Sequence, residues 1–423
     1  MIMIKESFRK YLEEAIGSEN ALVAFSAFEK PSSVSVRLNP FKKGCDLEGR
    51  KVPWSPYGIL LDERPSFTLD PFFHAGAYYV QDSSSMFVGH VFRQLLKNVR
   101  IPEGRPLRVL DLCAAPGGKT TDLAASLREQ LGDGFLLVAN EVMKARVGIL
   151  ADVPCSGEGM FRKDEQAQNQ WSEDNVALCE ARQRRIIADV WPSLAPGGVF
   201  IYSTCTFNKY ENDGNVRWVA SELGAEVLVE DFAGGFEGII KTECGYSLVP
   251  GHVEGEGQYC AALIKGEEVE YKEGRYRPDS RSKTVQLAGI GADVLEMEVS
   301  YSLKGDTVVA VPKSLITDVD LLRSTLHVVA SGCAVGTMKG KLFIPGADLA
   351  LSIALAKDAY PKVEVDRNTA LAYLHRDAIV LPEAEKGYVL ICHNGVPLGF
   401  VKNLGNRCNS LHPQSRRIRM DIK

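Results

Sequence analysis

"LDLCAAPGGKTTDLAASL", residues 110–127, decides the fold prediction because it runs from an apolar strand through a turn of small residues into a helix. Such a turn lets a ligand approach the backbone, and the helix offers free N–H groups and its positive dipole end. The glycine spacing fits neither a P-loop nor GxGxxG, so a tight turn without a ligand is the alternative. The next strand ends in Glu141, about where a Rossmann-type acid binds a ribose. Loop and acid together predict an adenosine-containing cofactor, either a dinucleotide or S-adenosylmethionine.

Short apolar runs alternate with helical stretches over residues 107–263, and the runs end in polar or reactive residues. The expected strands are residues 108–114, 135–141, 149–155 and 197–205, followed by a final strand at 255–266. This alternation predicts an α/β fold with a parallel sheet. Sites in such sheets lie outside the carboxyl ends of the strands.

The length of 423 residues is too great for one ordinary core and predicts two or three domains. The composition is 45% hydrophobic and 24% charged, and no apolar run is long enough to span a bilayer. Glu6, Glu13 and Glu14 occupy the region that a signal peptide would keep apolar, so we expect a cytoplasmic location and no membrane partner. A net charge of −5 gives no support to bulk nucleic-acid binding but leaves room for a local basic patch.

The chain has ten cysteines with no CxxC pair, which argues against a disulfide framework and against a zinc or other metal site. We expect most of them to be small, inert core residues. That prediction covers Cys45, Cys179, Cys244, Cys260, Cys333, Cys392 and Cys408.

Cys155 and Cys205 differ from the others because each stands at the end of a predicted strand. Two thiols at one sheet edge fit covalent catalysis on an electron-poor ring, where a thiolate adds to carbon and a second group assists release. Methylation of cytosine at carbon 5 needs such a thiolate, since that carbon is not nucleophilic until carbon 6 is attacked. For either cysteine alone, an inert core position remains the alternative.

Three segments resemble motifs I, IV and VI of the NSUN family of RNA (cytosine-5) methyltransferases: DLCAAPGGKT (111–120), ADVPCSGEG (151–159) and STCTFNKYEN (203–212). SVRLNP (35–40) and QDSSSM (81–86) resemble that family's N-terminal signatures, and the likeness covers residues 30–265 closely. The remainder resembles the bacterial ribosomal-RNA branch. The resemblance implies a Rossmann-like class I methyltransferase sheet, an N-terminal α+β extension and a C-terminal α+β region ending in a PUA-like β domain.

The resemblance also implies roles for single residues. Cys205 would be the nucleophile, and Cys155 would assist product release by helping to remove the carbon-5 proton. Asp152 would lie near the cofactor and bind the cytosine edge, and Glu141 would bind the ribose of S-adenosylmethionine. The methionine end of the cofactor would be wrapped by Cys113, Ala114, Ala115, Pro116, Gly117, Gly118 and Lys119. Lys119 would add a positive charge to the catalytic pocket, with a surface position as the alternative.

The segment between Glu141 and Asp152 departs from the family, which has a further strand and helix there, with an acid that contacts adenine. A parallel crossover needs about a dozen residues or more, and this segment is too short to supply one. We therefore predict that residues are missing from this sequence near Gly148 and Ala151. The alternative is a natural deletion that leaves a degenerate, inactive site.

The predicted domains are an N-terminal RNA-binding extension (1–80), the methyltransferase domain (81–265), a linker and middle domain (266–355) and a PUA-like RNA-binding domain (356–423). The expected partner is small-subunit ribosomal RNA, bound by a monomer. The expected RNA contacts are Arg37 and the tail residues Arg416, Arg417 and Arg419, although a solvated basic tail is the alternative. Competing functions are a transfer-RNA or DNA cytosine-5 methyltransferase and a non-catalytic ribosome-assembly factor.

Overall fold

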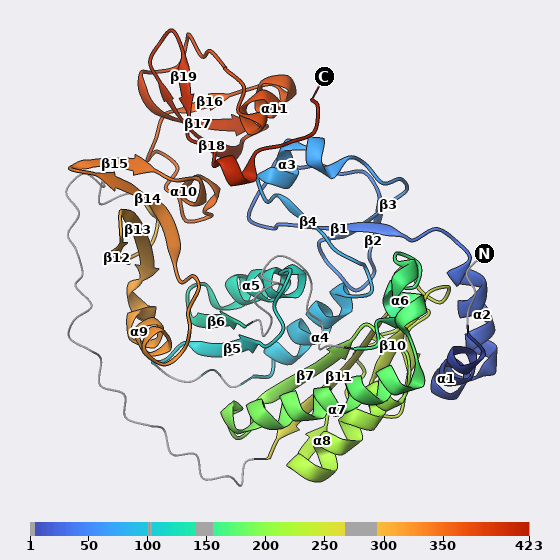
Figure 1. Ribbon diagram of the computed structural model, residues 1–423. Helices are drawn as coiled ribbons and strands as arrows, with labels where there is room; N and C mark the ends of the chain where they lie inside the picture. The colour runs from blue at the N-terminus through green and yellow to red at the C-terminus, as the bar shows by residue number, and fades with distance from the viewer. Residues whose placement is uncertain (1–4, 100, 102–103, 141–154, 267–293, 423) are drawn as a thin grey trace. The chain divides into compact units, whose positions relative to one another are not determined.

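A computed structural model describes residues 5–99, 101, 104–140, 155–266 and 294–422 of the chain (Figure 1). The chain divides into two compact units. The first comprises Met1–Arg37, Glu48–Arg64 and Val80–Glu273, and the second comprises Leu38–Leu47, Pro65–Tyr79 and Gly274–Lys423. Among the described residues, no helix is long and apolar enough to cross a membrane.

The first unit begins with two helices, α1 (Glu6–Ile16) and α2 (Ser18–Phe28), whose apolar faces share a core with the buried rings of Phe161 and Trp171. A small antiparallel sheet follows, in which β1 (Val34–Leu38) and β2 (Arg50–Lys51) both pair with β3 (Gly58–Leu61). Helix α4 (Met86–Leu96) then leads into the predicted methyltransferase region.

The opening stretch folds as the sequence predicts. Strand β5 (Leu107–Asp111) runs into helix α5 (Gly118–Leu131), and β6 (Phe135–Ala139) pairs with β5 in parallel, with Asp111 opposite Ala139. The strand candidate at 149–155 falls almost wholly outside the described residues. The predicted gap near Gly148 and Ala151 lies outside them as well.

A second sheet of the first unit has the order β7-β11-β10-β9, with β8 also paired to β11. Its pairings are antiparallel, so the sheet structure is mixed and not purely parallel as the alternation predicted. The reason is that β11 follows β10 after a short connection, and strands joined in this way pair antiparallel. The strands are β7 (Val199–Thr204), β8 (Ala225–Val227), β9 (Ile240–Lys241), β10 (Tyr246–Leu248) and β11 (Gln258–Lys265).

Helices cover both faces of the β7–β11 pair. Alternate residues of β11 point in opposite directions. Cys260 and Ala262 pack with α4, while Tyr259, Ala261 and Leu263 pack with helices α7 (Glu173–Val190) and α8 (Asn215–Leu223). Figure 1 shows α7 and α8 lying along these strands. The short helix α6 (Glu165–Gln170) precedes α7.

Helix α4 connects the β5–β6 region to the β7–β11 sheet, because it packs against α5 as well as against β7 and β11. Its crossing with α5 is close, since a Cβ atom on Gly89 would collide with the carboxylate of Asp122. That carboxylate accepts a hydrogen bond from Arg93 of α4 at 2.9 Å. Helix α4 therefore fixes the position of the motif I helix relative to the end of β7.

The second unit contains two four-stranded sheets. The first is antiparallel, in the order of β12 (Val299–Lys304), β13 (Thr307–Pro312), β14 (Cys333–Lys339) and β15 (Leu342–Pro345), and has helices α9 (Ile316–Thr325) and α10 (Ala347–Leu351). The second is ordered β16 (Lys362–Glu364), β17 (Gly387–His393), β18 (Val396–Asn403) and β19 (Cys408–Ser410), with helix α11 (Arg367–His375). Helix α3 (Pro71–His74) and strand β4 (Tyr78–Val80) complete the described helices and strands.

The hairpin predicted at Asn394-Gly395 is confirmed. These two residues connect β17 to β18, with His393 opposite Val396. Both have positive φ, 46° and 75°, as a two-residue turn between right-twisted strands requires. The side chains of the hairpin fill two cores, one shared with α11 and the other with β13 and β14.

Candidate active site

The loop after β5 is held in shape by the strand's last residue. Asp111 accepts hydrogen bonds from the Cys113 amide at 3.3 Å and from the Thr120 hydroxyl at 2.5 Å, so its carboxylate ties the start of the loop to the start of α5. The Ala114 amide donates to the carbonyl of Asn140 at the end of β6. Both ends of the loop are thus tied to the carboxyl edge of the β5–β6 pair.

Gly117 gives this loop a conformation that other residues rarely adopt. Its φ is +110°, and a Cβ atom there would meet nothing within 4 Å. The glycine is therefore needed for its backbone angle and not to avoid a neighbouring residue. The space beside it is open, and the 14-residue helix α5 begins at the next residue. An open cradle before a helix N-terminus has room for the charged methionine end of S-adenosylmethionine, and the backbone N–H groups of the helix can bind its carboxylate.

Arg37 supports the loop from behind. Its guanidinium donates to the Thr121 hydroxyl at 2.6 Å, to the Gly118 carbonyl at 3.2 Å and to Gln81 at 2.8 Å. The side chain is only 3% exposed. The expectation that Arg37 contacts RNA is therefore wrong, because its guanidinium is buried against the first turn of α5.

Lys119 is half-buried on the first turn of α5. Burial raises the pKa of the Cys260 thiol on β11 to about 12, and the positive charge of Lys119 partly opposes that rise. Cys260 pairs with Ser203, two residues before Cys205. The Lys119 charge therefore acts on the strand that pairs with β7, and its place in the catalytic pocket stays a prediction.

Cys155 and Cys205 come together as the motifs predict. Their sulfur atoms are 3.2 Å apart, both side chains are partly exposed, and neither sulfur is in a disulfide. Gly159 lets the two loops approach this closely, because its amide donates to the Cys205 carbonyl at 2.7 Å. A Cβ atom on Gly159 would lie 2.7 Å from that same carbonyl oxygen.

Two buried glutamates beside the cysteines were missed by sequence reasoning. Glu158 and Glu211 are both 0% exposed and accept hydrogen bonds from the loops around the thiols. Burial and the nearby charge of Glu158 raise the pKa of Glu211 to about 7. The signal was present in the motifs, since each glutamate stands within six residues of a strand-end cysteine.

The remaining cysteines agree with the prediction of inert positions. Burial raises the pKa of each thiol, which disfavours the nucleophilic thiolate. This applies to Cys45, Cys179, Cys244, Cys260, Cys333, Cys392 and Cys408.

Two predicted site residues, Glu141 and Asp152, lie outside the described residues. Among the described residues, no cluster of His, Cys, Asp or Glu is suited to hold a metal ion.

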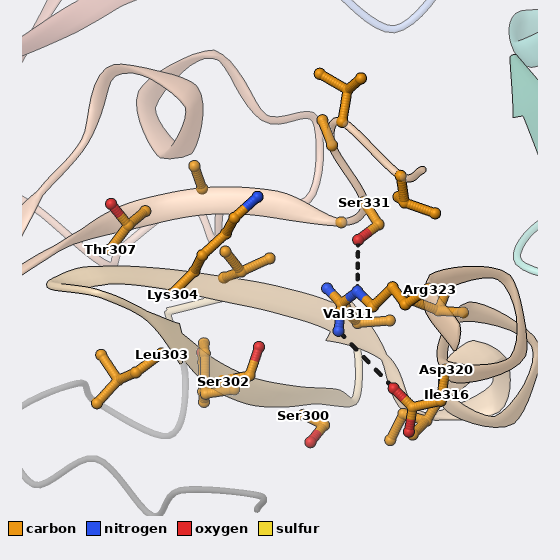
Figure 2. Close-up of a pocket in the computed structure, with 18 of the residues that line it drawn as sticks. Ser300, Ser302, Leu303, Lys304, Thr307, Val311, Ile316, Asp320, Arg323 and Ser331 are labelled. Atoms are coloured by element: carbon orange, nitrogen blue, oxygen red, sulfur yellow. Dashed lines mark hydrogen bonds and ion pairs between the residues drawn. The ribbon is translucent and has the colours of Figure 1, made fainter. Parts of the chain in front are cut away.

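The second unit has a cavity of about 910 Å³ between β12, β13 and α9 (Figure 2). Its Arg323 donates to the Ser331 hydroxyl at 3.0 Å and lies 3.8 Å from Asp320, so this cation is already engaged by its own neighbours. No residue that the motifs single out lines this cavity.

Three family models match the chain. They are the N-terminal domain of 16S rRNA methyltransferase RsmF over residues 4–83, 16S rRNA methyltransferase RsmB/F over residues 139–264, and the methyltransferase RsmF PUA domain over residues 360–418. The fold is also similar to that in a crystal structure of PH0851, with a TM-score of 0.50 and 21% identity. The match covers 62% of this chain and 66% of the PH0851 chain. At that identity the likeness shows the fold alone.

Curated relatives match over most of the chain. The ribosomal RNA small subunit methyltransferase F of Serratia proteamaculans is 27% identical, with 92% of this chain and 91% of the relative aligned. Its namesake in Cronobacter sakazakii is 31% identical over 64% of this chain and 65% of the relative. The alignment with the Shewanella loihica namesake extends over 480 residues, more than this chain's 423, so that relative has positions that this chain lacks.

A strand, a glycine cradle and a helix N-terminus beside the strand ends define the fold as that of a Rossmann-like methyltransferase. The chain belongs to the RsmB/F family of 16S rRNA methyltransferases, the bacterial ribosomal-RNA branch of the NSUN family, and carries a C-terminal PUA domain. The family uses S-adenosylmethionine, which decides between the two cofactors that the loop allowed.

Proposed function

We propose that this protein methylates carbon 5 of a cytosine in small-subunit ribosomal RNA through a covalent adduct with Cys205. The observation that carries the proposal is the 3.2 Å contact between the sulfurs of Cys155 and Cys205 at the end of β7. A single exposed thiol would serve many chemistries. Two thiols in contact suit a reaction in which one attacks the ring and the other assists release.

The reaction begins when the Cys205 thiolate forms a bond to carbon 6, which moves the electrons of the ring double bond and makes carbon 5 nucleophilic. S-adenosylmethionine, when bound, supplies the methyl group that carbon 5 takes up. Cys155 then helps to remove the carbon-5 proton. The electron pair of that C–H bond restores the double bond, and the carbon 6–sulfur bond breaks to release Cys205. Asp152 holds the ring edge during these steps.

The residues that would hold the cofactor are those of the open loop, Cys113 to Lys119, together with Glu141 on the ribose. The loop contributes backbone N–H groups and the positive end of α5, and the Lys119 ammonium adds a positive charge near the reacting ring. These roles follow the motif resemblance and are supported by the open space at Gly117.

Trapping with 5-fluorocytosine-containing RNA tests the assignment. Fluorine at carbon 5 blocks proton removal, so the adduct accumulates on the cysteine that attacked carbon 6. We expect adduct formation by the wild-type protein and by Cys155→Ala, but none by Cys205→Ala. An adduct that survives Cys205→Ala and is lost in Cys155→Ala would instead assign the nucleophile to Cys155, as in DNA cytosine-5 methyltransferases.

The competing functions have their own tests. Bisulfite sequencing of ribosomal and transfer RNA from a deletion strain separates the two RNA substrates, and we expect the lost methylation in small-subunit ribosomal RNA. A non-catalytic assembly factor would leave both RNAs unchanged. Calorimetry with S-adenosylmethionine addresses the same alternative, because failure of the purified protein to bind it would favour a binding role.

The proposal extends to the RNA-binding parts. Residues 1–80 would form an RNA-binding extension, 81–265 the catalytic domain, 266–355 a linker and middle domain, and 356–423 the PUA-like domain. The protein would act as a cytoplasmic monomer. In the tail, Arg416, Arg417 and Arg419 are exposed, although Arg416 also pairs with Asp348 at 2.6 Å. Charge reversal at all three should weaken RNA binding and lower its salt dependence, and unchanged values would remove the tail from the interface.

A further inference from the structure

The loops that carry the two cysteines are joined by two glutamates in a reciprocal way. Glu158 lies three residues after Cys155, and its carboxylate accepts hydrogen bonds from the amides of Phe207 at 2.6 Å and Asn208 at 3.1 Å, just after Cys205. Glu211 lies six residues after Cys205, and its carboxylate accepts from the Ser156 amide at 3.1 Å, next to Cys155. Each cysteine loop therefore holds the backbone of the other.

The Asn208 side chain bridges the two carboxylates. Its amide nitrogen donates to Glu158 and to Glu211, each at 2.9 Å. Further donors complete the network, with Trp171 on Glu158 at 2.9 Å and Gln183 on Glu211 at 2.8 Å. All five side chains are essentially buried, so the carboxylates depend on these donors in place of water.

Such a network is costly as a mere source of stability. Two carboxylates buried near one another repel and lose their hydration, and an apolar core of the same volume would be at least as stable. Its location gives it another use, because the hydrogen-bonded amides lie close to the two cysteines: Ser156 follows Cys155 directly, and Phe207 and Asn208 lie two and three positions after Cys205. The network thereby determines how the thiols face each other.

We propose that Glu158 and Glu211 form a reciprocal clamp that positions the Cys155 and Cys205 thiols in contact. Both are positioning residues, since they act through the backbone next to each cysteine. Their role in catalysis rests on the proposed function. When the Cys205 sulfur is bonded to carbon 6, the clamp holds the Cys155 sulfur within reach of the same ring, which release of the product requires.

Oxidative cross-linking of the two thiols measures the clamp without reference to catalysis. Diamide oxidises a thiol pair: the two sulfurs join in one bond, and the reagent takes up two electrons and two protons to become a hydrazine. In full-length Glu211→Gln, a side-chain amide replaces the carboxylate. Its NH2 group cannot accept the hydrogen bonds that one carboxylate oxygen accepted. We expect the Cys155–Cys205 cross-link, followed by peptide mass mapping, to form about tenfold more slowly than in the wild type.

The matched control is Glu222→Gln, which makes the same change at an exposed glutamate of α8. It should cross-link at the wild-type rate. A folded Glu211→Gln protein that also cross-links at the wild-type rate would overturn the clamp, since a purely structural glutamate changes the free energy of unfolding without separating the thiols.

Asn208→Ala provides a second variant in case Glu211→Gln does not fold. It keeps both carboxylates but removes their bridge, so they repel most when both are ionised. The titratable groups facing Glu211 are Glu158, Cys179 and Tyr202. The rate of cross-linking in Asn208→Ala, divided by the wild-type rate at the same pH, should be several-fold lower at pH 8 than at pH 6. A ratio that does not change with pH would contradict the clamp.

Single-turnover methylation connects the clamp to the reaction. Glu211→Gln should lower the rate of methyl transfer about tenfold while leaving the affinity for S-adenosylmethionine unchanged. If no variant or wild-type protein methylates cytosine but cross-linking still slows, the proposed function fails and the clamp stands. If methylation occurs and cross-linking is unaffected, the clamp fails and the proposed function stands.

Discussion

The loop after β5 and the two cysteine turns, which begin at Cys155 and Cys205, lie in the same unit but are built differently. The loop from Cys113 to Lys119 takes its form from backbone conformation, above all the φ of +110° at Gly117, and the space beside that glycine is open. The cysteine turns take theirs from buried side chains, with Glu158 and Glu211 hydrogen-bonded across them.

The difference follows from what each region must do. A cofactor that is bound by backbone N–H groups needs a cradle of the right shape and free space, and side chains would obstruct it. A covalent reaction needs two sulfur atoms held at a set separation, and that requires rigid support from several directions. Removal of a side chain should therefore be tolerated at Cys113 in the loop and damaging in the cysteine turns.

The largest expected difference is between two cysteines. Cys205→Ala removes the proposed nucleophile and should lower the single-turnover rate of methyl transfer to 16S rRNA about a thousandfold or more. Cys113→Ala should lower it less than about threefold, because Cys113 contributes its amide to the loop. Transfer of a radiolabelled methyl group measures both rates, and comparable losses would contradict the contrast.

The second effect is a pH dependence of stability in the cysteine turns. The pKa of Glu211 is about 7 in the folded protein and 4.5 as its ordinary value, so between these values the folded state binds the proton more tightly than the unfolded state. The free energy of unfolding should therefore fall as the pH rises through this window, by at most about 3 kcal/mol from this group.

Urea unfolding of the wild type and Glu211→Gln across pH 5 to 8 tests this expectation. The wild type should lose stability relative to the variant as the pH rises to about 7, and the difference should be constant above that. Glu222→Gln should follow the wild type throughout. A difference that grows in favour of the wild type with rising pH would have the wrong sign.

The third effect concerns the cradle. Gly117→Ala forces a Cβ atom onto a left-handed backbone angle and should weaken S-adenosylmethionine binding about tenfold, which corresponds to about 1.4 kcal/mol of strain. Gly132→Ala is the matched control at the other end of α5, where φ is also positive, +59°, and the space is also open. Calorimetry should find wild-type affinity for the control, and equal losses would point to general damage to α5.

The smallest effect should come from the support behind the loop. Thr121→Val removes the acceptor of the 2.6 Å hydrogen bond from Arg37. The guanidinium keeps its hydrogen bonds to the Gly118 carbonyl and to Gln81. The affinity for S-adenosylmethionine should fall about twofold. A loss larger than that of Gly117→Ala would break the contrast, since the loop would then depend on side chains as the cysteine turns do.

Much of the fold could be predicted because its signals are local. Strands β5 and β7 and the Asn394-Gly395 hairpin follow from short runs of residues whose periodicity and turn chemistry act within a few positions, although β5 ends at Asp111, three residues before the predicted end. The antiparallel arrival of β11 could not be predicted in this way. It depends on the connections that bring β10 and β11 beside β7.

Arg37 shows why the prediction of contacts was less successful. Its positive charge and its place in a family signature suggested an RNA contact, but its partner Thr121 is 84 positions away and comes into reach only when the N-terminal sheet packs on α5. The two glutamates were overlooked for a related reason, because a carboxylate in a motif reads as solvent-exposed until the surrounding donors are known.

The sequence by itself determined the cofactor cradle, since the backbone angle at Gly117 and the start of α5 depend on adjacent residues. Only the tertiary structure decided that Cys155 and Cys205, 50 positions apart, bring their sulfurs to 3.2 Å. That contact depends on donors from β7, α7 and the loops around both cysteines acting together, and a hydrogen bond between distant segments exists only once the sheet and its helices have packed.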